Sequence, residues 1–473
     1  NYSNASRVAL STQEVLVVED DLESPDVVLA GRQKQGFRLK NGFVQVVLTG
    51  VIAFCGCGMF NALQGLGGAG SSDPAVSAFA NFLLYACFCF FGYFAGAFFN
   101  TFGAKVLITA GALAYALYGL MSYLVGLPEF SSWASAVFIA AGGLTGIGAA
   151  FFWSAQGALM MAYAPAHKKA QYISTFWVLF NLGGFIGGMI AFATTFGNSG
   201  STATHANPAT YFAYIGIMCV GVLISATLLV TPSKVVRADG FPVVVPKQLP
   251  FRQEVLAVAN VILDGSMIRL TVLFFFSNFF YTYVFNGVNA QLFTIRTRGL
   301  NSALYFGSQM FGTKLFALVA DYDTGNRSLV SRARGAFTVT FSFCVVAWGL
   351  GVYLRYGYNG GYLHGSGKTL IDFASIEWVF PVINFILYGI SDSMVQTYCY
   401  WLMSLLGKND PALCCKYCGY FKSIQSLGAA IAWLLDSEYL RVAYVTQMWI
   451  CICLLLVGLP LSVTVFQRLA RLE

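Results

Sequence analysis

Long apolar runs recur along most of the chain and are separated by short polar segments. Each run has about 20 residues or more, the length that an α-helix needs to cross the hydrocarbon core of a bilayer. The predicted helices are 42–65, 75–99, 105–125, 133–163, 171–196, 209–230, 266–290, 302–320, 335–354, 376–405, 411–435 and 441–467. The pattern therefore predicts an all-α integral membrane protein with twelve transmembrane helices.

Two polar segments are much longer than the others and suggest a domain organisation. Residues 1–40 carry the acidic run Glu19 to Asp26 followed by basic residues, which predicts a cytoplasmic tail. Residues 231–265 are basic and contain proline, and they divide the predicted helices six and six. We therefore expect an N-terminal six-helix bundle (41–230), a cytoplasmic linker (231–265) and a C-terminal six-helix bundle (266–473).

The composition supports a membrane protein. Hydrophobic residues make up 57% of the chain, charged residues 10%, and the mean hydropathy is +0.68. A soluble domain carries about 25% charged residues, so this chain has too few to cover a water-exposed surface. The net charge of +7 comes from basic residues scattered over short loops, which favours membrane topology over nucleic-acid binding.

The loop charges predict the orientation. If the N-terminus is cytoplasmic, most Lys and Arg fall in cytoplasmic segments, as the positive-inside rule requires. The outer loops then hold only Arg296, Arg298, Arg355, Lys368 and Arg441. We therefore predict that both termini are cytoplasmic; the charges do not distinguish the plasma membrane from an endomembrane.

Signatures of enzymes, metals and cofactors are missing from the sequence. The three histidines are isolated, and no nucleophile triad or phosphate-binding loop is present. Cys414, Cys415 and Cys418 favour packing or acylation over zinc, because no further ligand lies nearby. The glycines of 65–70 match a dinucleotide pattern, but a membrane helix rather than a strand precedes them. We expect no enzymatic activity, no metal and no cofactor.

The two halves of the chain resemble each other. "FNALQG" from Phe60 ends the first predicted helix, and "FNGVNA" from Phe285 ends the seventh. Asn181 follows Phe176 at the same offset as Ser426 follows Phe421, in the fifth and eleventh helices. These matches predict a parallel repeat of two six-helix units about a pseudo-two-fold axis.

Two loops carry a resemblance to the major facilitator superfamily. The loop after helix 75–99 matches the superfamily signature at Gly96, Gly103 and Lys105, whereas Asn100 and Thr101 replace its Asp and Arg. The equivalent loop of the second half keeps charged residues: Asp321, Asp323, Arg327, Arg332 and Arg334. The resemblance implies the major facilitator fold and conformational gating by Gly96, Asn100, Gly103, Lys105, Asp321 and Arg332.

Within that superfamily the chain resembles the uncoordinated-93-like (Unc-93-like) group, and in particular its fungal members. The stretches that carry the resemblance are 58–70, 176–188, 277–287, 296–312 and 419–433. Animal members are known as a potassium-channel regulatory subunit and as a trafficking chaperone of innate-immune receptors. The resemblance thus implies a transporter-like fold, and it leaves a non-transporting role open.

Ionisable residues inside predicted helices are the first candidates for function, because charge in a bilayer is costly. Lys314, Asp392 and Lys422 fall at similar predicted depths, and we expect them to form a charged cluster in a central cavity. Asp392 is the candidate for coupling to H⁺ or K⁺, and the lysines favour an anionic solute. The alternative is a fixed ion pair with lysines that snorkel to the surface. For Arg269 and Lys416 the second interpretation is favoured.

A set of polar side chains is expected to shape the rest of the cavity. Its members are Asn61, Gln64, Gln156, Asn181, Asn278, Tyr281, Asn286, Gln309, Gln396 and Gln425. Individually, such amides more often bond one helix to another. Trp153 and Trp177 are likewise more typical of packing than of ligand binding.

The sequence thus supports two functions. The first is a secondary active transporter that moves a small solute by alternating access, with or without coupling to an ion. The second is a non-transporting regulator or trafficking chaperone that binds another membrane protein, such as an ion channel.

Overall fold

The structure is a computed structural model of the chain. It describes residues 39–65, 74–125, 127, 133–165, 168–197, 208–237, 253, 256, 260–322, 326–358, 370–407, 411–437 and 439–471. The predicted tail up to Arg38, most of the linker, glycines 66–70 and Asp323 lie outside the described residues.

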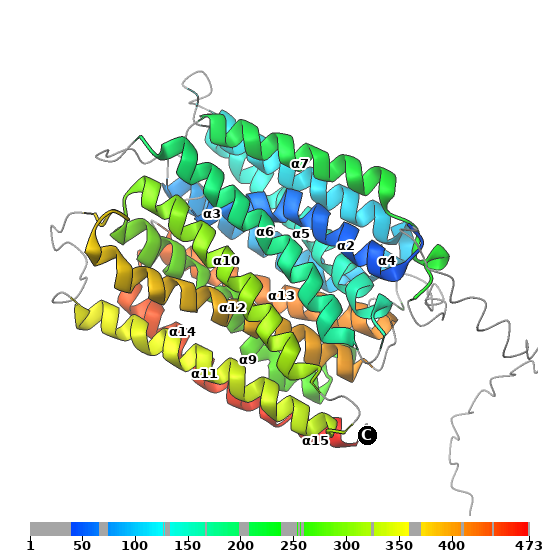
Figure 1. Cartoon of the computed structure of the whole chain (residues 1–473). Helices are drawn as coiled ribbons and strands as arrows, with labels where there is room; N and C mark the ends of the chain where they lie inside the picture. The colour runs from blue at the N-terminus through cyan, green and yellow to red at the C-terminus, as the bar shows by residue number, and fades with distance from the viewer. Residues whose placement is uncertain are drawn as a thin grey trace, which may run out of the picture. The chain divides into compact units, whose positions relative to one another are not determined.

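The N-terminal half, residues 41–230, contains the six predicted helices (Figure 1). The first is α2 (Gly42–Ala53), continued by the π-helical η1 (Phe54–Gly58) and by α3 (Met59–Gly65). The next two are joined in α4 (Pro74–Leu124). They are followed by α5 (Ala134–Tyr163), α6 (Lys169–Thr195) and α7 (Pro208–Leu228). The short helix η5 (Pro232–Lys234) begins the linker.

The C-terminal half, residues 266–473, repeats the order. It consists of α9 (Gly265–Phe279) with the π-helical η6 (Tyr283–Ala290), α10 (Ile295–Ala320), α11 (Leu329–Tyr356), η8 (Ile376–Trp378) with α12 (Val379–Leu406), α13 (Pro411–Asp436), and α14 (Tyr444–Val463) with α15 (Phe466–Ala470). The sequence therefore predicted each of the twelve helices. Within the described residues, nine helices are long and apolar enough to span a membrane; α4 counts once, and the lysine-bearing α10 and α13 are not among them.

Gly103 separates the two spans that α4 joins. Its backbone has φ 79° and ψ 159°, a conformation that is essentially restricted to glycine. A Cβ atom at this position would meet nothing within 4 Å, so the backbone conformation rather than crowding requires the glycine. This is one of the signature glycines of the loop.

The first helix of each half contains a π-helical segment, η1 in one and η6 in the other. Such segments are rare and often mark functional sites. They occur in the two helices that the repeated "FN" motifs predicted to be equivalent. The segments differ in position, since η1 ends before Phe60 whereas η6 includes Phe285.

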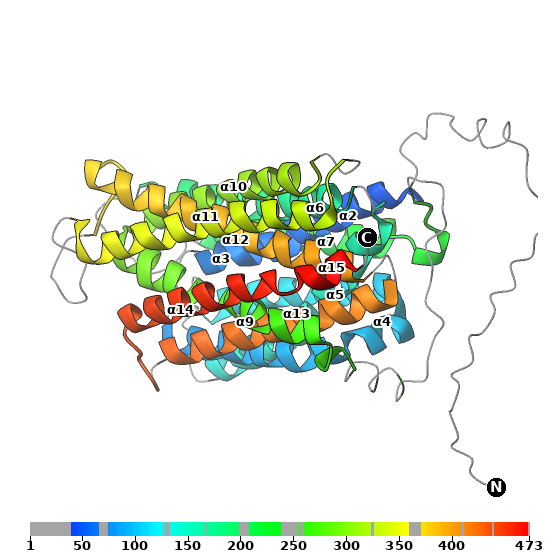
Figure 2. The same ribbon diagram turned by 90° about the horizontal axis from the view of Figure 1, so that it is seen from below.

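The two halves meet along closely packed helices. α6 packs against α10, and α13 packs against both α4 and α5 (Figures 1 and 2). A Cβ atom added to Gly188 of α6 would lie 2.5 Å from the backbone nitrogen of Ala303, and one on Gly184 would lie 2.5 Å from the ring of Phe306. The glycines of α6 thus allow the close helix contact that their spacing predicted.

Candidate functional site

A cavity of about 40 Å³ lies between the two halves. The N-terminal half lines it with Phe60, Asn61, Leu84, Tyr85, Phe88, Tyr115, Trp153, Trp177 and Phe180, and the C-terminal half with Asn278, Tyr281, Gln396, Lys422 and Gln425. We call these two sets the aromatic wall and the polar wall. A space of this size holds water molecules, so any larger solute requires the walls to move apart.

The aromatic wall is held by contacts among its own rings. Phe180 meets Trp153 and Trp177 edge to face, with centroid distances of 5.1 Å and 5.3 Å. The indole N–H of Trp153 donates to the hydroxyl of Tyr115 at 3.0 Å. Edge-to-face packing restrains each ring, so the wall keeps its shape without charged groups.

Lys422 is the cation of the polar wall, and it is only 3% exposed. Its ammonium lies 4.5 Å from the ring centroid of Trp153, 4.9 Å from that of Phe421 and 5.3 Å from that of Tyr400. Trp153 belongs to α5 of the opposite half. The cation is therefore stabilised by ring faces contributed by both halves, and among the described residues it makes no salt bridge.

Two glutamines connect Lys422 to Asp392. The ammonium donates to Oε1 of Gln425 at 2.7 Å, and Nε2 of Gln425 donates to Oε1 of Gln396 at 2.8 Å. Nε2 of Gln396 then approaches Oδ1 of Asp392 at 3.4 Å. All three hydrogen bonds point from the cation towards the carboxylate, so the two amide dipoles bridge the opposite charges.

Asp392 lies behind the cavity and is 1% exposed. Its Oδ2 accepts hydrogen bonds from the hydroxyls of Tyr281 (3.0 Å) and Tyr305 (2.9 Å) and from Nε2 of Gln309 (2.9 Å). Three donors thus converge on one oxygen. A carboxylate can stay charged away from water only when such donors replace its hydration.

The structure brings most of the predicted cavity residues together. Asn61, Asn278, Tyr281, Gln396, Lys422 and Gln425 line the cavity, and Asp392 bonds to two of them. Gln64 and Asn286 lie elsewhere. Gln64 donates to Asn81 of α4, and Asn286 donates to Asp436 of α13. Both fit the alternative role of joining helices.

Lys314 does not join the predicted cluster. Its side chain is exposed, whereas the neighbouring Gly312, Thr313 and Phe316 are buried. The buried Gln309, five residues earlier, faces Asp392; since successive residues turn by about 100°, position 314 points away from it. The expected cluster of three charges is therefore corrected to the pair Asp392 and Lys422.

One candidate was missed from the sequence, since Tyr305 bonds directly to Asp392. Trp153 and Trp177, which the sequence favoured as packing residues, border the cavity. Tyr305 directly precedes Phe306, whose ring lies against Gly184. Nothing in its local pattern distinguished it from other aromatic residues.

At the end where α6 begins, predicted to face the cytoplasm, polar contacts join the two halves. The ammonium of Lys169 donates to the backbone carbonyl of Ser404 at 2.5 Å. The backbone N–H of Gln171 donates to Oδ2 of Asp321 at 3.0 Å, and Asp321 also pairs with Arg332 at 3.4 Å. Asp321 and Arg332 were predicted gating residues.

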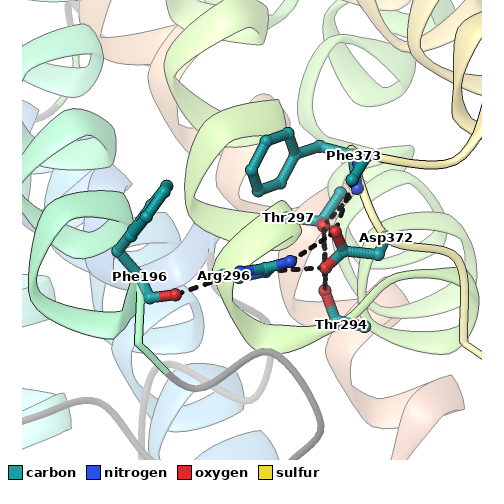
Figure 3. Close-up of polar contacts among 7 residues, drawn as sticks. Phe196, Thr294, Arg296, Thr297, Asp372 and Phe373 are labelled. Atoms are coloured by element: carbon teal, nitrogen blue, oxygen red, sulfur yellow. Dashed lines mark hydrogen bonds and ion pairs between the residues drawn. The ribbon is translucent and has the colours of Figure 1, made fainter.

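At the opposite end, Arg296 joins the two halves (Figure 3). Its guanidinium pairs with Asp372 at 2.7 Å and donates to the carbonyl of Phe196, at the end of α6, at 3.1 Å. The Arg296 hydrogen bonds lower the pKa of Asp372 to about 2. The sequence used Arg296 only to predict orientation. We call Arg296, Asp372 and Phe196 the outer clasp.

Comparisons with known proteins agree with this fold. Residues 77–460 match the family model described as "Ion channel regulatory protein UNC-93". UNC93-like protein 1 of Arabidopsis thaliana is 36% identical over 431 residues, covering 90% of each chain. UNC93-like protein C922.05c of Schizosaccharomyces pombe is 34% identical over 418 residues, covering 87% of this chain and 80% of that protein.

Among solved structures, the chain is similar to a proton:xylose symporter of the major facilitator superfamily, XylE. The TM-score is 0.58 over 89% of this chain and 94% of the symporter, at 13% identity. At this identity the likeness shows the fold alone.

Proposed function

This chain belongs to the UNC-93 family and has the major facilitator fold, and on that premise we propose that it is a secondary active transporter that moves a small anionic solute by alternating access. The proposal assigns residues 41–230 and 266–473 to two bundles that rock about the cavity, joined by a cytoplasmic linker at 231–265. The protein is a multi-pass membrane protein, and we propose that both termini are cytoplasmic.

The observation that carries the proposal is a buried cation and a buried carboxylate beside one cavity. Lys422 and Asp392 are joined through Gln425 and Gln396 rather than in direct contact. A pair that only stabilised the fold would gain most from direct contact, because attraction falls with distance. Charges kept apart inside a membrane protein leave each one available to a ligand.

Opening must break different contacts on the two sides. Access from the side predicted to be cytoplasmic requires separation of Lys169 from Ser404 and of Gln171 from Asp321. Access from the other side requires release of Arg296 from the carbonyl of Phe196 within the outer clasp. Because each set joins the two halves at one end only, a rocking motion can break one while preserving the other.

The surroundings of Asp392 favour a proton over K⁺ as the coupling ion. The partners of Oδ2 are hydroxyl and amide donors, and protonation of the carboxylate would remove a buried charge. Coordination of K⁺ instead requires several oxygen atoms that replace its hydration shell. We therefore assign proton coupling to Asp392.

A second function is favoured by the description of the family model, which names an ion channel regulator. In that role the chain would bind a membrane protein partner such as a channel, and the charged pair would stabilise the fold only. The transporter and the regulator make opposite predictions for variants of Lys422 and Asp392.

The test is uptake of radiolabelled or isotopically labelled organic anions into proteoliposomes under an imposed pH gradient. The variants Lys422→Met and Asp392→Asn are compared with the unmodified chain after each has been shown to be monodisperse. The transporter proposal expects gradient-driven uptake that both substitutions reduce. Uptake unaffected by both substitutions contradicts it, and recovery of an intact channel complex with both variants supports the regulator.

A further inference from the structure

The two walls of the cavity differ in chemistry, and from this difference we infer the class of solute. We propose that the site binds a compact aromatic monocarboxylate, with its ring against the aromatic wall and its carboxylate at Lys422. The inference rests on the proposed transport function and specifies its substrate.

The aromatic wall can recognise a flat apolar ring. Apart from Asn61 and Leu84, every residue of this wall is aromatic. Trp153 and Trp177 lie with centroids 6.2 Å apart and Phe180 packs against both, so their remaining surface faces the cavity as one block. Stacked and edge-to-face contacts between rings add stabilisation beyond area burial.

The polar wall can recognise one negative charge. The ammonium of Lys422 bonds to Gln425 and otherwise faces three rings. A carboxylate would give it a charge-assisted hydrogen bond, which is stronger than a bond to a neutral amide. Asp392 lies close behind this wall and would repel a second negative charge, so a monoanion fits better than a dianion.

Trp177 supplies a second donor. It is 2% exposed, borders the cavity, and its indole N–H has no acceptor among the described residues. The N–H of Trp153, by contrast, is already bonded to Tyr115. A buried donor without an acceptor is unfavourable, and an oxygen atom of a carboxylate would satisfy it.

Two other solute classes fit less well. Aromatic residues often bind organic cations, but here the ammonium of Lys422 already lies over three rings and would repel another cation. A sugar needs polar partners on every side, whereas the aromatic wall offers few. The small volume of the closed cavity further favours a compact solute.

The test measures binding directly, by thermal stability and by calorimetry of the full chain in detergent. The probes are benzoate and 2-naphthoate, with cyclohexanecarboxylate (no aromatic ring), acetate (no ring), benzamide (no charge), benzyltrimethylammonium (opposite charge) and xylose as controls. The proposal expects benzoate or 2-naphthoate to bind at least about tenfold more tightly than every control.

Two variants test whether Lys422 and Trp177 contact the bound carboxylate. Lys422→Met is expected to weaken binding of the aromatic carboxylates by about ten- to a hundredfold, because it removes a charged hydrogen bond. Trp177→Phe keeps the ring and removes the N–H, and it is expected to weaken binding about five- to tenfold. If Lys422→Met does not fold, Trp177→Phe alone still tests the site.

The outcomes separate this inference from the proposed function. Tight binding of the aromatic carboxylates without gradient-driven uptake supports the site and contradicts transport. Coupled uptake of an organic anion of another class, or equal binding of acetate, overturns the inference and leaves the transport proposal standing. Equal binding of benzyltrimethylammonium or xylose overturns both the inference and the anionic solute of the transport proposal.

Discussion

The N-terminal and C-terminal halves share an order of helices, but they line the cavity with different kinds of side chain. The N-terminal half contributes rings, and the C-terminal half contributes the lysine and the amides, with the carboxylate behind them. The gating loops show the same division. The uncharged Asn100 and Thr101 belong to the first segment, and Thr101 donates to the carbonyl of Ala97 in its own helix. The second segment instead carries the ion pair of Asp321 and Arg332.

This difference indicates how a duplicated fold can specialise. Both halves keep the order of helices, and the first helix of each contains a π-helical segment. Charge is concentrated in one half, where each charged group can be hydrogen-bonded by neighbours. We propose that the C-terminal half provides charge recognition and coupling, and that the N-terminal half provides shape.

The largest effect is expected from Asp392→Asn. The substitution keeps the shape and removes the titrating group, so uphill uptake under a pH gradient should fall by about a hundredfold or more, while downhill exchange continues. The matched control is Asp436→Asn, in the same half, whose carboxylate accepts from Asn286. Proteoliposome uptake measures both. Equal losses in the two variants would contradict a special role for Asp392.

The second effect concerns the contact between the halves. Gly188→Val should slow transport by less than Asp392→Asn does, because the added side chain would overlap the backbone of Ala303 and force α6 away from α10. Gly349→Ala is the control, since a Cβ there meets nothing within 4 Å. Uptake and size-exclusion profiles of both variants report the result. A fully active Gly188→Val protein would show that close approach of these helices is not needed.

A smaller effect is expected when the amide bridge is cut. Gln425→Leu keeps both charges and removes their connection, so the pH at which uptake is half-maximal should shift while the maximal rate falls only about three- to tenfold. Gln447→Leu removes another buried glutamine, one that bonds to the carbonyl of Val442. Matching pH profiles for the two variants and the unmodified chain would contradict electrostatic coupling through the bridge.

The smallest effect concerns the pH dependence of the outer clasp. The pKa of Asp372 is lowered to about 2, so the stabilisation by its pair with Arg296 is complete above the ordinary value of about 3.9 and is lost only as the pH falls through 2. Between pH 5 and 8 the clasp should therefore not change. Uptake by Arg296→Gln should keep the same relative pH profile as the unmodified chain, at an altered rate. A changed pH profile in this variant would contradict this expectation, because it would show that a group of the outer clasp titrates between pH 5 and 8.

The sequence predicted the helices well and the site in part. Hydropathy set each span, and the rarity of charge in a membrane identified Asp392 and Lys422. It could not place Lys314, because depth along a helix says nothing about which face a residue occupies until the neighbours are known. Tyr305 and the clasp of Arg296 with Phe196 depend on contacts between segments far apart in the chain. No local pattern encodes such contacts.

The most direct test of the account is the proton flux driven by a solute gradient. Proteoliposomes containing an internal pH indicator are given an outward or inward gradient of the tightest-binding aromatic carboxylate, with no imposed pH difference. The account predicts proton movement with the anion in the unmodified protein and in Asp436→Asn, and none in Asp392→Asn or Lys422→Met. Proton flux that persists in Asp392→Asn at the unmodified rate would contradict the assignment of proton coupling to Asp392.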